Sequence, residues 1–343
     1  MKKKVSIIVP TRNESAHIAD TLKSIFAQDY PSKFTEVIIV DGDSDDNTPN
    51  VVANMIADRP NARLISNPEK VVPYALNYAI KASTGEIIIR MDSHSIYPLN
   101  YISLLVGEMN RLNSDNVGGV CVTLPANDGL VATGIALAIS HPFGIGNSTF
   151  RIGSKDIREV DTVPFGCFKR SLFDKIGMFD TDLIRNQDDE FNGRIIKNGG
   201  KIHLIPQIKI KYFARGNVHS LMKMFYHYGL FKPLVNKKLG ASATLRQFVP
   251  PLFTLFLVSA ILLPVIPLIF QLIWACLLFV YLIMAFLVGA TLAKKVNRPA
   301  LFFVVPFLFP LIHVSYGWGY LKGYFLVNVL KKKLGKKDFA ISR

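Results

Sequence analysis

The longest stretch of this chain without a charged side chain is the 47-residue segment 247–293. A membrane-spanning helix needs about 20 apolar residues, so this segment is long enough for two such helices. The sequence PVIP at 264–267 divides it and is typical of a turn. We therefore predict a helical hairpin formed by residues 248–264 and 267–293.

A second uncharged stretch covers residues 299–321, and the basic sequence KKKLGKK follows at 331–337. A single crossing here would carry that basic sequence to the far side of the membrane, against the tendency of Lys and Arg to remain inside. Pro310 and several glycines would also interrupt a straight helix. We therefore predict a re-entrant segment or a tight second hairpin, rather than a third span, between residues 299 and 330.

Charge is divided unevenly between the two halves of the chain. Residues 1–190 contain 24 acidic and 19 basic side chains, a net of −5, whereas residues 191–343 contain 1 and 21, a net of +20. Nucleic-acid binding is disfavoured because the basic residues flank apolar segments instead of forming one soluble face. Flanking Lys and Arg predict cytoplasmic loops and contact with anionic membrane lipids.

The N-terminal half contains three short apolar runs, at residues 5–9, 37–40 and 86–91, separated by helical patterns at about 15–28 and 70–83. This alternation predicts a parallel sheet covered by helices. The polar sequences PTRNE, DGDSDDNT and DSHS follow the three runs. Ligands bind at the carboxyl ends of such strands, so we expect these polar residues to share one site.

The DGDSDDNT sequence, which starts at Asp41, allows two interpretations. It is typical of an Asx-turn, and it can also present a carboxylate to a nucleobase or ribose. An EF-hand is excluded because the required downstream Glu is missing.

Asp92 and His94 follow the third strand and are two residues apart. A carboxylate and an imidazole at this spacing can face one divalent cation, which would neutralise a diphosphate. The alternative for His94 is a hydrogen-bonded loop histidine.

The third acidic cluster, RNQDDEFNGRI at 185–195, starts a predicted helix that Gly199 and Gly200 end. A carboxylate here can serve as a general base. For Asp189 we favour a simple interaction with the helix dipole. Segments 141–151 and 160–170 are predicted as loop and as strand plus turn, and residues 212–238, which lack acids, as an amphipathic helix at the membrane interface.

Taken together, VSIIVPTRNE, VIIVDGDSDDNT, Asp92-Ser93-His94 and NQDDEFNGRI resemble the four signatures of family-2 glycosyltransferases with the GT-A fold, over about residues 5–240. HPFGIGNSTFR, VDTVPFGCFKR, the YG of FYHYG and HVSYGWG resemble the succinoglycan-biosynthesis glucosyltransferase-like branch. Those enzymes extend lipid-linked sugars for bacterial exopolysaccharide.

The resemblance implies an α/β catalytic domain with a Rossmann-like, mostly parallel sheet, followed by a small membrane region. The expected divisions are a catalytic domain (1–211), a basic interfacial segment (212–246), transmembrane or re-entrant helices (247–330) and a basic cytoplasmic tail (331–343). The expected location is the bacterial inner membrane, with the catalytic domain on the cytoplasmic side.

The resemblance also implies roles for individual residues. Asp188 matches the catalytic Asp and would be the base of an inverting transfer. Asp92 and His94 match the Asp-x-Asp metal motif, and the imidazole favours Mn²⁺ over Mg²⁺. The residues implied at the nucleotide sugar, for which a UDP-sugar is favoured, are Pro10, Thr11, Asn13, Glu14, Asp41 and Asp92.

The implied acceptor is a glycan linked to a polyprenyl diphosphate, with Arg215, Lys223 and Lys232 as candidate contacts for its phosphates. Two other functions remain open. A membrane scaffold of this fold could bind sugar nucleotide or lipid without turnover. A processive polysaccharide synthase normally has more spans and a Gln-x-x-Arg-Trp motif, and the corresponding region here reads MKMFYHYGLF.

Overall fold

A single curved β-sheet forms the centre of the N-terminal part of the molecule. The computed structural model describes residues 2–242 and 244–335. Strand order is β3-β2-β1-β4-β8-β6-β9-β5, with β7 beside β9. The strands are β1 (Val5–Thr11), β2 (Thr35–Asp41), β3 (Ala62–Ser66), β4 (Ile87–Arg90), β5 (Ser95–Ile96), β6 (Asn116–Leu124), β7 (Arg158–Glu159), β8 (Cys167–Lys169) and β9 (Ile202–Phe213).

Strands β1 to β4 are parallel, as the alternation of strands and helices predicts. Their apolar runs are buried on both faces of the sheet. Ile7 and Val9 of β1 belong to the buried hydrophobic cluster on one face, and Ile8 belongs to the cluster on the other face. Strand β8 is antiparallel to both β4 and β6, so the sheet is mixed beyond β4. This arrangement leaves the carboxyl ends of β1, β2 and β4 along one edge.

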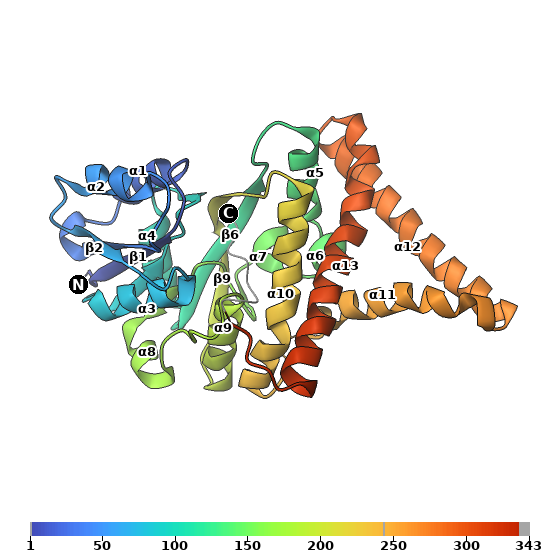
Figure 1. Ribbon diagram of the computed structural model, residues 1–343. Helices are drawn as coiled ribbons and strands as arrows, with labels where there is room; N and C mark the ends of the chain where they lie inside the picture. Colours follow the sequence, from blue (N-terminus) through green and yellow to red (C-terminus); the bar gives the residue numbers. More distant parts are fainter. Residues whose placement is uncertain (1, 243, 336–343) are drawn as a thin grey trace.

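Two layers of helices cover the sheet (Figure 1). One layer contributes α1, α2 and α4 to one buried cluster, and the other contributes α3, α8 and α9 to the second. Their bounds are α1 (Ile18–Phe26), α2 (Thr48–Ile56), α3 (Val72–Ala82), α4 (Tyr101–Arg111), α8 (Arg170–Ile176) and α9 (Gln187–Lys197).

Segment 141–151 differs from its prediction. The expected loop contains two short helices, α6 (Pro142–Ile145) and α7 (Thr149–Ile152), which follow α5 (Leu130–Ala138). Phe143 and Ile145 of α6 pack against the C-terminal helices. The sequence alone gave no sign of this tertiary contact, and it stabilises helical turns that would be too short to persist alone.

The described C-terminal part contains the α-helices α10 (Val218–Leu239), α11 (Val249–Val258), α12 (Leu268–Lys295) and α13 (Val305–Tyr324). The helix predicted over residues 212–238 corresponds to α10, which starts only at Val218 because β9 continues through Phe213. Helices α11 and α12 form the predicted hairpin with its turn at residues 264–267, and they project away from the rest of the molecule (Figure 1).

The predicted second hairpin between residues 299 and 330 is wrong. Helix α13 is continuous through Pro310 and lies beside α10 (Figure 1). Its glycines do not break it; they let the two helices approach closely. A Cβ atom at Gly319 would lie 2.1 Å from the Tyr226 carbonyl oxygen, and one at Gly323 would lie 2.1 Å from the Leu230 carbonyl oxygen.

Among the described residues, three helical segments are long and apolar enough to cross a membrane, judged by length and composition: 245–265, 268–295 and 299–329. The third is much more buried within the protein than the first two. Residues 336–343 of the predicted basic tail lie outside the described residues.

Candidate active site

One large cavity, about 860 Å³ in volume, opens at the carboxyl ends of β1 and β4. It continues past α9 and the α6–α7 segment to α11, α12 and α13. Most of the predicted site residues line it together: Pro10, Thr11, Asn13, Glu14, Asp92, His94, Asp188, Arg215 and Lys232. Asp41 and Lys223 are not among the residues that line it.

The loop after β1 is held against the loop after β2 by direct hydrogen bonds. The backbone N–H of Asn13, a residue with φ of 53°, donates to Ser44 Oγ at 2.9 Å, and Asn13 Oδ1 accepts from the Asp45 N–H at 2.8 Å. The Glu14 N–H donates to Thr48 Oγ1 at 2.8 Å. These bonds fix the backbone of both loops at the edge of the cavity.

Asp41 belongs to the turn and does not face the cavity. Its carboxylate accepts hydrogen bonds from the Ser44 N–H at 2.9 Å and from Ser44 Oγ at 2.6 Å, a local contact three residues on, whereas the Asx-turn that the sequence allowed spans two. Direct contact between Asp41 and a base stays a prediction. The neighbouring residues Gly42 and Asp45 line the cavity.

Asp92 lies at the end of β4, and a buried arginine holds its carboxylate. Arg90 donates from Nε to Asp92 Oδ1 at 2.6 Å and from Nη2 to Asp92 Oδ2 at 3.0 Å. The remaining terminal nitrogen, Nη1, donates to Asp188. One guanidinium therefore joins the predicted metal ligand to the predicted base, and charge-assisted bonds of this kind are strong.

His94 is buried, and burial lowers its pKa to about 4, so its imidazole is neutral at pH 7. Its Nδ1 is 3.6 Å from Glu14 Oε1, too far for a hydrogen bond, and has no hydrogen-bond partner among the described residues. A neutral imidazole with an unused nitrogen close to a carboxylate fits a divalent ion. Within residues 2–242 and 244–335 no group of three or more His, Cys, Asp or Glu side chains could hold a metal. A metal here would therefore need further ligands, which diphosphate oxygens can supply.

Asp188 is in the first turn of α9, directly after a backbone bend. Asn186 caps the helix in a left-handed conformation, with φ of 61°, and its side chain donates to the Tyr228 carbonyl oxygen of α10 at 2.8 Å. Burial raises the pKa of Asp188 to about 6, against the lowering effect of Arg90. The pKa of this carboxyl group is therefore near neutral pH, which is the range that suits a general base.

Asp189 and Lys232 form an ion pair that the sequence did not indicate. Lys232 Nζ is 2.7 Å from Asp189 Oδ2, so the two charges form an ion pair between α10 and α9. Asp189 therefore has a specific partner in addition to the helix dipole. Lys232 is at the cavity, but its charge is already neutralised there.

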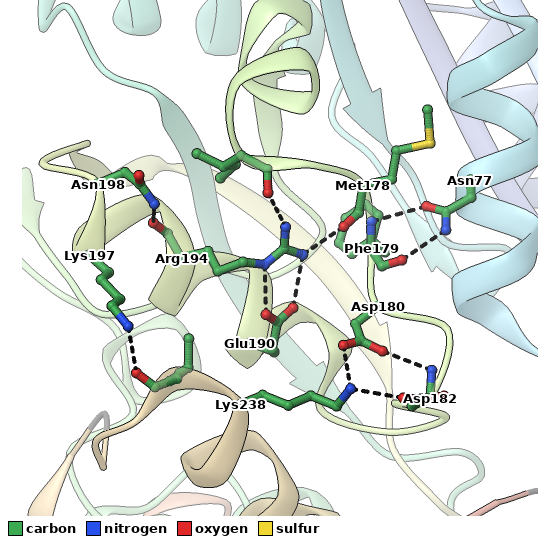
Figure 2. Close-up of polar contacts among 12 residues, drawn as sticks. Asn77, Met178, Phe179, Asp180, Asp182, Glu190, Arg194, Lys197, Asn198 and Lys238 are labelled. Carbon is green, nitrogen blue, oxygen red and sulfur yellow. Dashed lines mark hydrogen bonds and ion pairs between the residues drawn. The ribbon is translucent and has the colours of Figure 1, made fainter.

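A second set of contacts fixes α9 from its other side (Figure 2). Arg194 donates to both carboxylate oxygens of Glu190, at 2.6 and 2.9 Å, and to the carbonyl oxygens of Ile176 and Met178. Lys238 of α10 pairs with Asp180 at 2.7 Å. These bonds connect α9 with the end of α8 and the loop after it, and connect that loop with α10, so the position of Asp188 depends on all of these elements.

Sequence reasoning missed three arginines that also line the cavity, Arg90, Arg151 and Arg185. The sequence could have indicated a paired Arg90, because an arginine at the end of the buried apolar run IIIR needs an anionic partner. Arg151 and Arg185 are in segments that give no such signal.

Comparison with known proteins matches residues 6–177 to the glycosyl transferase family 2 profile. The chain belongs to this family. A curated relative from Methanococcus voltae is 30% identical over 328 residues, which is 93% of this chain and 96% of the relative. Its name is dolichyl N-acetyl-alpha-D-glucosaminyl phosphate 3-beta-D-2,3-diacetamido-2,3-dideoxy-beta-D-glucuronosyltransferase.

A second relative, the succinoglycan biosynthesis protein ExoA of Rhizobium meliloti, is 25% identical over 246 residues, or 71% of this chain and 73% of that protein. Among solved structures, a mannosyltransferase from Pyrobaculum calidifontis in complex with GDP-Man and Mn²⁺ has a TM-score of 0.58 and 21% identity. The match covers 93% of this chain and 88% of that one. These likenesses confirm the predicted GT-A fold and the resemblance to the succinoglycan-biosynthesis branch.

Proposed function

We propose that this glycosyltransferase moves a sugar, with inversion, from a nucleotide sugar to a membrane acceptor in which a glycan is linked to a polyprenyl phosphate or diphosphate. One observation carries the proposal. A single cavity contains the Asp92–His94 pair and Asp188, and it continues to helices that are apolar enough to cross a membrane.

The donor side is proposed from the strand ends. The loops after β1 and β2 would hold the nucleotide, and Asp92 and His94 would hold a divalent metal, with Mn²⁺ preferred because one ligand is an imidazole. When bound, such a metal would neutralise charge on the diphosphate. The structural neighbours contain GDP-Man with Mn²⁺ and UDP-GlcNAc; a UDP-sugar is the donor that we expect here.

The chemical step is proposed for Asp188. Its carboxylate would accept the proton of the acceptor hydroxyl as the new bond to the anomeric carbon forms and the bond from that carbon to the diphosphate oxygen breaks. Arg90 would hold Asp188 and Asp92 at a fixed separation, so that the base lies beside the donor.

The acceptor and the location are supported by the helices and by the relatives. The name of the Methanococcus relative describes transfer to a dolichyl-linked sugar phosphate. For this chain we propose the plasma membrane, with the catalytic domain and both flanks of the α11–α12 hairpin on the cytoplasmic side, as their Lys and Arg residues favour.

The test uses the full chain in detergent with a panel of UDP-, GDP- and dTDP-sugars, with and without Mn²⁺ and a short polyprenyl-diphosphate-linked sugar. We expect one nucleotide sugar to transfer a single residue to the lipid-linked sugar. A ladder of products would instead indicate a processive synthase. Binding of a nucleotide sugar with no transfer to any acceptor would indicate a scaffold.

Topology has its own test. A Lys332→Cys variant in a Cys276→Ser background is labelled with a membrane-impermeant maleimide, since Cys121 and Cys167 are buried. We expect labelling only after the cells are permeabilised. Labelling of intact cells would place the end of α13 outside, which would mean that α13 crosses the membrane as a third span.

A further inference from the structure

Arg151 and Arg215 line the active-site cavity without forming an ion pair among the residues that the structure describes. Nη1 of Arg151 is buried and has no hydrogen-bond partner within those residues. A buried donor of a charged group is costly to leave unpaired, so its position indicates an anionic ligand.

Arg151 lies against the ring of Tyr212, and Arg215 is close to that tyrosine along the chain. The guanidinium of Arg151 is 4.9 Å from the centroid of the Tyr212 ring, and the His94 ring is 5.6 Å from the same ring. Arg215 follows Tyr212 by three residues, just after β9. The cationic group is therefore beside the Asp92–His94 pair, on the side formed by β9 and α7.

The same segment that carries Arg151 reaches the membrane helices. At its start, the Phe143 carbonyl oxygen accepts a hydrogen bond from His313 Nε2 of α13 at 3.0 Å. Because that nitrogen carries the proton, His313 Nδ1 accepts from the Tyr281 hydroxyl of α12 at 2.9 Å. Polar side chains within apolar helices commonly mark a substrate path.

Beyond the arginines, the cavity is lined by apolar and aromatic side chains of the membrane helices, including Phe253, Tyr281, Ile312 and Tyr316. A cationic group next to an apolar passage matches a phosphate ester of a long hydrocarbon chain. We infer that Arg151 and Arg215 bind the phosphate of the lipid-linked acceptor, with its first isoprene units between α11, α12 and α13.

This inference rests on the proposed function and replaces two of the three predicted acceptor contacts. Lys223 is not at the cavity, and the charge of Lys232 is paired with Asp189. The donor diphosphate is the other source of a phosphate group. We assign the arginines to the acceptor because the cavity continues from them to the membrane helices.

The test measures binding, so it does not depend on turnover. Dissociation constants of the detergent-solubilised full chain are determined for undecaprenyl phosphate, for undecaprenol, and for UDP and GDP with Mn²⁺. We expect the wild type to bind the phosphate at least about 10-fold more tightly than the alcohol, the range of one or two charged hydrogen bonds. Arg151→Gln and Arg215→Gln should each lose about 10-fold for the lipid phosphate alone.

Two further variants control the result. Arg151→Lys keeps the charge, so it should retain part of the affinity and shows whether the site tolerates substitution. Arg158→Gln removes an exposed cation of β7 that does not line the cavity, and should change nothing. Unchanged nucleotide binding shows that each variant is folded.

Two outcomes overturn the inference. If the Gln variants weaken nucleotide binding and leave lipid phosphate binding intact, the arginines serve the donor. If every variant binds both probes as the wild type does, the arginines have only a structural role. A protein that binds undecaprenyl phosphate as expected but transfers no sugar would contradict the proposed function and leave this inference standing.

Discussion

Two arginines of one cavity, Arg90 at the end of β4 and Arg151 in α7, differ in what their charges contact. The guanidinium of Arg90 forms ion pairs with two carboxylates of the chain itself, Asp92 and Asp188. Arg151 contacts aromatic rings and has a buried nitrogen without a partner among the described residues. The strand-end region is therefore organised before any ligand binds, whereas the region near the membrane helices has charge left for a ligand.

The strand-end region is expected to be the more sensitive to substitution. Asp188→Asn should lower kcat by about 10²- to 10⁴-fold, the contribution of a positioned base, while the Kd for the donor stays unchanged. Asp174→Asn, which alters an exposed acid of α8, is the matched control and should leave kcat unchanged. A near-normal kcat for Asp188→Asn would show that another group is the base.

Arg90→Met tests whether this region is held together by one guanidinium. Removal of a buried charge leaves two nearby carboxylates without their partner, so the free energy of unfolding should fall by about 3 kcal/mol in urea denaturation. Arg111→Met removes an exposed arginine paired with Glu108 and should leave the free energy of unfolding nearly unchanged, because an exposed ion pair contributes little to stability. Equal effects of the two variants would mean that the Arg90 pairs do not stabilise the fold.

Substitution of His94 distinguishes a metal ligand from a histidine that only packs within its loop. His94→Ala should weaken Mn²⁺-dependent donor binding by about 10-fold or more, the scale seen for perturbed metal sites. His94→Asp should restore binding and shift the preference towards Mg²⁺. Titration calorimetry with UDP and each metal checks both. If chelators and His94→Ala leave donor affinity unchanged, His94 is a loop histidine.

The smallest expected effect is the dependence of activity on pH. Because the pKa of Asp188 is raised to about 6, the base becomes protonated as the pH falls through that value, and activity is lost on the acidic side. The log of kcat/KM should therefore rise with slope one below about pH 6 and level off above it. A profile that is flat between pH 5 and 8 would contradict the raised pKa.

Sequence reasoning located the strand-end region because its determinants are local. The apolar runs at 5–9, 37–40 and 86–91 are confirmed as β1, β2 and β4, and the parallel order brings the polar residues after β1 and β4 to one edge. The proximity of Asp92 and Asp188, 96 positions apart, followed from the family motif and is explained by Arg90.

The region near the membrane could not be predicted in the same way, because its structure depends on contacts between distant segments. Arg151 is in a stretch that reads as loop, and its importance arises only when α7 packs beside Tyr212. Likewise, the glycines of α13 suggested interruption, since their function is visible only when α10 lies against them.

The close contact between α10 and α13 also determines which helices can be exchanged in an engineered protein. A Cβ atom on Gly229 would lie 2.0 Å from the Tyr316 carbonyl oxygen, so neither helix can be replaced by an unrelated apolar sequence without separating the pair. Although 299–329 has the composition of a membrane span, α13 is structurally part of the catalytic unit. The base of the hairpin is held in the same way, because a Cβ atom on Gly317 would lie 2.4 Å from the Pro250 carbonyl oxygen of α11, and Phe253 and Tyr281 line the cavity. The exchangeable anchor is therefore the outer end of the hairpin alone, around residues 259–273.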